Sequence, residues 1–136
     1  MKFITLAGKT RKILGINKYL IDWEGKSKSK FQKSVKDFFK EYWQRQIVFE
    51  EFPVAGSRMT FDFYNANQKI AIEVQGAQHT RHVPFFHGDY KNNYLMQLKR
   101  DNDKHDFCEL NKIKLIEIYE KDKLTKAFFK KLDISL

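Results

Sequence analysis

The sequence predicts one α/β domain with a central mixed sheet of four strands flanked by helices, in the order α-β-β-β-α-β-α. Gly and Pro are scarce, with 6 and 2 among 136 residues, so most of the chain is expected to be regular structure. Apolar residues recur at helical spacing in some stretches and alternate as in strands in others. Helices and strands mixed along a chain of this length favour a single α/β domain.

The first expected helix begins at Ser27 or Ser29, either of which can cap it, and runs to about Gln44. One face of it is expected to be buried, with the lysines mainly on the other face. The expected apolar positions are Phe31, Val35, Phe38, Phe39 and Tyr42. Strands are expected at 47–54, 58–64, 69–75 and 113–119, and the later helices at 91–110 and 122–132.

The helix expected at 91–110 should bury Leu95, Leu98 and Phe107. Cys108 lies on the same helix and is expected to be buried rather than to act as a nucleophile. A single cysteine excludes an internal disulfide and fits a reducing, cytoplasmic compartment. No apolar run approaches the roughly 20 residues that span a bilayer, so a membrane is not an expected partner.

The net charge of +9 is concentrated near the N-terminus. Residues 1–46 hold 12 Lys and Arg against 4 Asp and Glu, whereas residues 47–136 hold 14 against 13. We therefore divide the chain into a basic N-terminal segment, 1–26, and a single domain, 27–136. Nucleic acid is the commonest polyanion that such a charge attracts, and a solvated lysine-rich surface is the alternative.

The two strands at 58–64 and 69–75 carry acidic groups in an otherwise apolar pattern. A turn at 65–68 that pairs Tyr64 with Lys69 would place Asp62 and Glu73 as diagonal neighbours on one face. The opposite face would then be an apolar layer, formed by Met59, Phe61, Phe63, Ile70, Ile72 and Val74.

Two carboxylates brought together repel each other and need a cation or a shared proton. A pair of oxygen ligands suits Mg²⁺, which commonly bridges protein carboxylates to phosphate and activates water. The alternative is that Asp62 and Glu73 are ordinary charges on a solvated face.

Asp62, ten intervening residues and Glu73-Val74-Gln75 resemble the D…(D/E)xK core of the PD-(D/E)XK nuclease superfamily. Three longer stretches are similar, in the same order, to the branch of very-short-patch-repair endonucleases and EDxHD homing endonucleases. They are SKFQKSVKDFF (29–39), FDFYNANQKIAIEVQGAQH (61–79) and RDNDKHDFCELNKIKLIEIY (100–119), so the resemblance covers about residues 27–119.

The resemblance implies a restriction-endonuclease-like fold and hydrolysis of DNA phosphodiesters by a metal-dependent endonuclease or nicking enzyme of phage or mobile-element type. It implies Asp62 and Glu73 as ligands of Mg²⁺ or Mn²⁺, and His79 as a general acid/base or a group that steadies the leaving group. Gln75 would orient water or phosphate. The supporting candidates are Gln32, His87, Asp101 and Lys104.

DNA is the expected partner, bound by a monomer or a homodimer. The expected phosphate contacts are Lys9, Arg11, Lys12, Lys28, Lys99 and Arg100. Gln32 stands where the branch has Glu, and Gln75 where it has Asp or Lys, and a glutamine cannot take a proton. A DNA-binding module with weakened catalysis is therefore a second hypothesis. A structural or interaction protein, and a nuclease that acts on RNA, also stay open.

Overall fold

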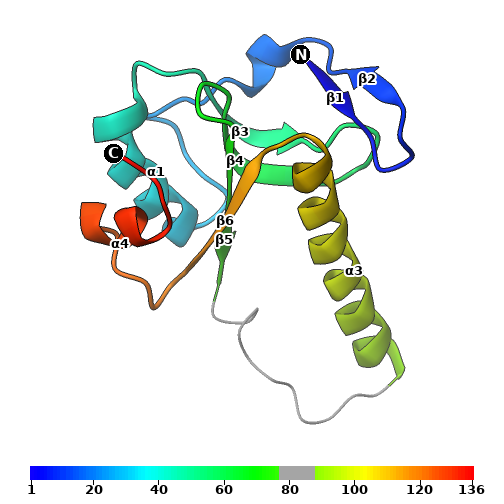
Figure 1. The fold of residues 1–136 in the computed structure, drawn as a ribbon. Helices are drawn as coiled ribbons and strands as arrows, with labels where there is room; N and C mark the ends of the chain where they lie inside the picture. Colours follow the sequence, from blue (N-terminus) through cyan, green and yellow to red (C-terminus); the bar gives the residue numbers. More distant parts are fainter. Residues whose placement is uncertain (77–87) are drawn as a thin grey trace.

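The computed structural model describes residues 1–76 and 88–136, with side chains for all of these except 88–94. The expected order of helix, three strands, helix, strand and helix is confirmed (Figure 1). These elements are α1 (Lys30–Trp43), β3 (Val48–Pro53), β4 (Thr60–Asn65), β5 (Ile70–Gln75), α3 (Gly88–Leu110), β6 (Lys114–Tyr119) and α4 (Lys126–Lys131).

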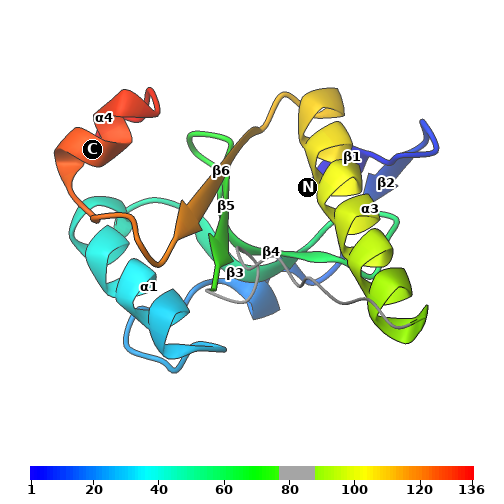
Figure 2. The same cartoon turned by 90° about the horizontal axis from the view of Figure 1, so that it is seen from below.

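The sheet is mixed, as expected, with strands in the order β3-β4-β5-β6. Strands β3, β4 and β5 are antiparallel neighbours, and β6 pairs with β5 in parallel. The crossover from β5 to the parallel strand β6 includes α3, because a parallel pair needs a long connection. Helix α3 lies on one side of the sheet, and α1 and α4 lie on the other (Figure 2).

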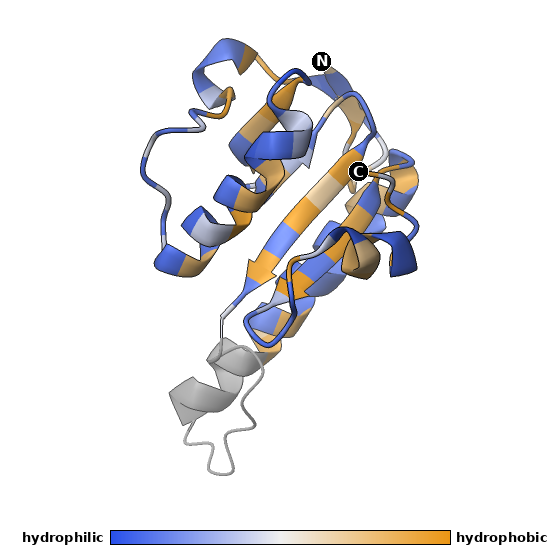
Figure 3. Cartoon of the chain, turned by 90° about the vertical axis from the view of Figure 1, so that its left-hand side faces the viewer, coloured by the Kyte–Doolittle hydropathy of each residue, from blue (hydrophilic) through white to orange (hydrophobic). Residues whose placement is uncertain are grey.

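Helix α1 begins where Ser29 caps it, because the Ser29 side chain accepts a hydrogen bond from the Gln32 N–H at 3.0 Å. Val35, Phe39 and Trp43 follow at four-residue spacing and are buried against the sheet. Hydrophobic and hydrophilic residues accordingly share the helices and strands in Figure 3. The expected lysine face has one exception, which is Lys36.

Lys36 is buried because its ammonium finds partners inside the protein. Its Nζ donates to Glu50 Oε1 at 2.8 Å and to the Asp22 carbonyl at 3.0 Å. A buried ammonium is tolerated only when it is paired in this way. The sequence pattern alone had assigned this lysine to the solvent side.

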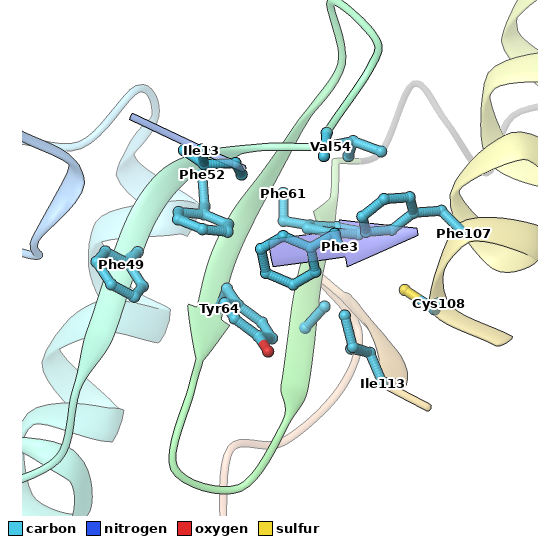
Figure 4. Packing of buried hydrophobic residues seen from close by; sticks show 12 residues of the cluster. Phe3, Ile13, Phe49, Phe52, Val54, Phe61, Tyr64, Phe107, Cys108 and Ile113 are labelled. Atoms are coloured by element: carbon cyan, nitrogen blue, oxygen red, sulfur yellow. The ribbon is translucent and has the colours of Figure 1, made fainter. Parts of the chain in front are cut away.

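The N-terminal residues form elements that the sequence analysis did not predict. A two-stranded antiparallel ribbon consists of β1 (Lys2–Ile4) and β2 (Thr10–Lys12), and a 3-10 helix follows at Ile16–Tyr19. Phe3 of β1 enters the core between the sheet and α3, where its ring contacts Phe52, Tyr64 and Phe107 (Figure 4). This contact joins the ribbon to the rest of the fold.

The register between β4 and β5 differs from the expected one by two residues. Tyr64 pairs with Ala71, and Asn65 pairs with Ile70. The turn is longer than expected because buried Asn65 accepts a hydrogen bond from the Gln68 N–H and Lys69 takes a left-handed conformation, with φ 56°. The shift brings Asp62 directly opposite Glu73 in sequence register, rather than diagonal to it.

The single apolar face expected for the hairpin is also wrong in part. Phe61 belongs to the core beside α3, whereas Phe63 belongs to the core beside α1 and α4. Two residues of one regular strand that are two apart would share a face. The regular pairing of β3 with β4 is interrupted between them, at Glu51 and Asp62, and Glu51 has a φ of 52°. The register is the same on both sides of this interruption, so the strands change side without an inserted residue.

Helix α3 buries fewer residues than the sequence predicts. Phe107 and Cys108 are buried, as expected, but Leu95 and Leu98 are 51% and 43% exposed. The N-terminal half of α3 extends past the end of β5, away from the sheet that buries its C-terminal half (Figure 1). Helix α4 begins four residues later than expected, with Thr125 as its cap.

Candidate functional site

A cavity of about 770 Å³ opens at the end of the sheet where β4 begins and β5 ends. Its walls are the first turn of α1, the residues that lead into β4, the end of β5 and the middle of α3. The polar residues that line it include Lys28, Gln32, Arg58, Asp62, Glu73, Gln75, Arg100, Asp101 and Lys104. The cavity therefore combines buried acids with cations from three separate segments.

Asp62 and Glu73 are the acidic centre of this cavity, and both are more than 90% buried. Glu73 Oε2 accepts a hydrogen bond from the Asp62 N–H at 3.0 Å, and Asp62 Oδ2 accepts one from the Val74 N–H at 2.8 Å. The two side chains thus replace strand-to-strand hydrogen bonds beyond the last regular pair, Phe63 and Ile72. Both carboxylates are held rigidly, and each keeps one oxygen free of backbone partners.

Burial and the closeness of Glu73 change the acidity of Asp62. Burial, together with the negative charge of Glu73, raises the pKa of Asp62 from its ordinary value to about 7, although the Val74 N–H opposes this shift. The charge of Glu51 raises this pKa further. A carboxyl group that takes up a proton so readily is one that a cation would stabilise in its ionised form.

Lys104 supplies a positive charge from α3. Its Nζ donates to Glu73 Oε1, and its side chain is only 17% exposed. Asp101, one turn earlier on the same helix, accepts a hydrogen bond from Gln97 Nε2 at 3.2 Å and also lines the cavity. Helix α3 therefore brings Lys104 into contact with Glu73 and places Asp101 in the cavity wall.

Gln32 lies in the wall formed by α1, but its amide faces another pair of acids. Its Nε2 donates to Glu50 Oε2 at 2.9 Å and to Glu51 Oε1 at 3.0 Å, and the residue is 1% exposed. Gln75 lies at the end of β5, half-buried in the cavity wall. Both glutamines therefore line the cavity.

Sequence reasoning missed the acids of β3. Glu50 and Glu51 stand in the middle of the apolar strand VFEEFP, which is the same signal that drew attention to Asp62 and Glu73. Glu51 stands opposite Asp62 in the register of β3 with β4, and its Oε1 accepts from Gln32. Arg58, which also lines the cavity, was missed because a single arginine in a turn carries no sequence signal.

The other candidates fall in different places. Lys28 and Arg100 line the cavity, and Lys28 Nζ lies 4.0 Å from Glu51 Oε2. Lys99 does not line it and pairs with Asp103 at 3.0 Å. Lys9 lies in the ribbon, next to β2, and His79 and His87 lie outside the described residues.

Metal-binding side chains in the described part of the chain form no cluster of three or more His, Cys, Asp or Glu. The acidic centre is therefore a pair of carboxylates. Cys108 is 2% exposed, and burial, chiefly, raises the pKa of its thiol to about 12. A thiol with such a pKa stays protonated near neutral pH, in agreement with the expectation that it is no nucleophile. None of the described helices is long and apolar enough to cross a membrane.

Comparisons with known proteins give one viral relative. A Frog virus 3 (isolate Goorha) protein, "Uncharacterized protein 094L", is 38% identical to this chain over 66 residues. The match covers 48% of the chain and 43% of the viral protein, which is less than half of either. No protein-family model and no solved structure matches the chain.

Proposed function

We propose that this protein is a divalent-metal-dependent endonuclease that hydrolyses phosphodiester bonds of DNA. The observation that carries the proposal is the buried pair Asp62 and Glu73, each fixed by a backbone N–H at the open end of the sheet. Lys104 lies against this pair, and Arg58 and Arg100 line the same cavity. Acids with adjacent cations suit a metal ion together with a phosphate.

The residues present fit a divalent ion. Asp62 and Glu73 are oxygen donors, each with one oxygen that accepts no backbone hydrogen bond; that oxygen of Glu73 accepts from Lys104, which an ion would have to displace. Burial and the charge of Glu73 raise the pKa of Asp62, and a bound cation would offset both effects. These two residues would hold Mg²⁺ or Mn²⁺. When bound, the ion would supply electrophilic activation of the phosphate and of an attacking water.

The cations of the chain would bind and orient the substrate. Arg58 and Arg100 carry positive charge into the cavity wall, where they would bind phosphate oxygens. Lys104 would stabilise the negative charge that develops as the phosphodiester is attacked. The Gln75 amide can donate to a phosphate oxygen or accept from a water, although it cannot take a proton.

The resemblance to the PD-(D/E)XK superfamily supports the same proposal. The mixed sheet, the order of the elements and the carboxylates on two neighbouring strands agree with what that resemblance implies.

A DNA-binding module with weakened catalysis is the second candidate. It is favoured by Gln32, whose amide nitrogen is engaged by Glu50 and Glu51 and which brings no carboxylate to the site. The two candidates differ in one result, since only the first hydrolyses DNA.

A cleavage assay with end-labelled duplex DNA separates them. The wild type should cut in Mg²⁺ or Mn²⁺, EDTA should stop it, and Glu73→Gln should cut at least roughly 100-fold more slowly, since it loses an electrostatic contribution of several kcal/mol. Glu109→Gln, which makes the same change at an exposed position of α3, should cut like the wild type. DNA binding by the wild type without cleavage in either metal would favour the second candidate.

A further inference from the structure

A second cavity, of about 390 Å³, lies beside the N-terminal ribbon. Its walls are β2 with the residues that follow it, Tyr19 of the 3-10 helix, and the turn between β3 and β4. Three cationic residues line it, Arg11, Lys12 and Arg58, and no acidic residue does. The cavity therefore offers concentrated positive charge at the surface.

Described acids do not neutralise this charge. Every residue of β2 is exposed, and the salt bridges among the described residues include none to Arg11, Lys12 or Arg58. Residues 1–21 contain five Lys and Arg and no Asp or Glu. Elsewhere in the described chain, by contrast, several lysines pair with acids, as Lys36, Lys99 and Lys104 do.

Arg58 connects the two cavities, because it lines both. The turn that carries it is well fixed: Ser57 Oγ donates to the Val54 carbonyl at 2.8 Å, and the Val54 N–H donates to the Met59 carbonyl at 2.9 Å. The turn is also tightly packed against Thr5, which follows β1. Gly56 has a φ of 81°, and a Cβ there would lie 2.8 Å from the Thr5 side chain.

We propose that the second cavity binds the DNA backbone beside the phosphodiester that lies in the Asp62/Glu73 cavity, with Arg58 at the junction. The inference rests on the proposed function, since it takes the same polyanion to pass through both cavities. Successive phosphates of one DNA strand can bind in two neighbouring cavities when one arginine, here Arg58, lines both. Asp62 and Glu73 repel any polyanion, so the strand would approach them only with a divalent ion bound, whereas Arg11, Lys12 and Arg58 would bind it without one.

Binding of DNA in EDTA tests this inference without cleavage. The double variant Arg11→Gln/Lys12→Gln should bind a labelled 30-base-pair duplex at least roughly tenfold more weakly at low salt, as followed by fluorescence anisotropy. Its plot of log affinity against log salt should lose a slope of about 1.8, because each phosphate contact contributes about 0.9. Arg58→Gln should lose about half of that slope.

A matched control is Lys130→Gln/Lys131→Gln. These two lysines are exposed on α4, on the other side of the sheet, and line neither cavity (Figure 2). In the control, the slope of log affinity against log salt should differ from that of the wild type by less than about 0.5, which is about half the contribution of one phosphate contact. Circular dichroism should show the same fold for all variants, since every substituted side chain in the two double variants is exposed.

The outcomes separate this inference from the proposed function. Equal DNA binding by Arg11→Gln/Lys12→Gln and the control, or a wild type that binds no duplex, would overturn the inference. Wild-type cleavage in Mg²⁺ together with equal binding would leave the nuclease proposal standing alone. A binding contrast without cleavage would support the second cavity as a DNA site and count against the nuclease. Equal competition by polyglutamate and by DNA would overturn the assignment of DNA as the occupant.

Discussion

Glu73 accepts a hydrogen bond from the backbone N–H of Asp62, which lies opposite it on the neighbouring strand, at 3.0 Å. Asp62 in turn accepts one from the N–H of Val74, at 2.8 Å. Each carboxylate is thus fixed by the strand that carries the other, so the two cannot move apart without breaking these bonds. The pairing of β4 with β5 therefore holds two carboxylates together although they repel each other when both are ionised.

Titration of Asp62 should make the free energy of unfolding depend on pH. Its pKa is about 7 in the folded protein, above the value of about 3.9 in an unfolded chain. The folded protein therefore holds the extra proton, and this contribution to stability is complete below about pH 4 and is lost as the pH rises to about 7. Without divalent metal, the free energy of unfolding should fall by up to about 1.4 kcal/mol per pH unit across this window.

Urea unfolding at several pH values measures this slope. Asp62→Asn should remove most of the slope, because the amide cannot titrate. Asp106→Asn, at an exposed position of α3, should keep it. A wild type and an Asp62→Asn variant with identical profiles from pH 4 to 7 would show that Asp62 has an ordinary pKa.

Divalent metal should oppose the loss of stability that the ionisation of Asp62 causes at higher pH. Binding of Mg²⁺ or Mn²⁺ favours ionised carboxylates, so the metal should raise the melting temperature of the wild type more at pH 8 than at pH 6. At a concentration about 100 times its Kd the stabilisation should reach about 2.7 kcal/mol. Thermal unfolding of Glu73→Gln should show little of this effect, and an equal metal response in the variant would exclude Glu73 as a ligand.

Lys104 should contribute both to folding and to cleavage. Lys104→Gln removes the partner of a buried carboxylate and should cost about 2–3 kcal/mol of unfolding free energy, as well as slowing cleavage. Lys99→Gln, on the same helix, breaks an exposed pair with Asp103 and should cost less than about 1 kcal/mol. Chemical denaturation of both variants compares them, and equal costs would contradict the role of Lys104 at the acidic centre.

The substitution Gln32→Glu distinguishes what the resemblance implies from what the hydrogen bonds of Gln32 predict. The family pattern alone suggests that a carboxylate at this position would improve the site. The structure predicts the opposite without metal, because the amide donates to both Glu50 and Glu51, and a carboxylate would repel them. Gln32→Glu should lower the melting temperature at pH 8.

The control for this change is Gln44→Glu, an exposed position just after α1, where the same substitution should cost well under 1 kcal/mol. A Gln32→Glu variant that melts like the wild type at pH 8 would show that Glu50 and Glu51 do not need the amide.

The order of the core elements was predictable from the sequence because each element has a local cause. Ser29 caps α1 with its own hydroxyl, and the apolar residues at four-residue spacing define its buried face. The convergence of Asp62 and Glu73 was also predictable. The expected and the observed registers differ by two residues, and because side chains alternate with a period of two, such a shift keeps both carboxylates near each other.

The remaining features depend on contacts that no local pattern reveals. Buried Asn65 and the left-handed Lys69 lengthen the turn and set the true register. The left-handed conformation of Glu51 and the interrupted pairing there accompany the change of side between Phe61 and Phe63, which a rule of strict alternation cannot describe. The ribbon was missed because strands of three residues are too short to show a period.

Nicking of a supercoiled plasmid tests whether Asp62 and Glu73 form a metal-dependent centre for DNA cleavage. The wild type, Asp62→Asn, Glu73→Gln and Glu109→Gln should be compared at pH 8 in Mg²⁺, in Mn²⁺ and in EDTA. We predict relaxed or linear plasmid with the wild type and Glu109→Gln in metal, and intact supercoiled plasmid in every other lane. Equal nicking by Glu73→Gln, or an intact plasmid with the wild type in both metals, would contradict the account.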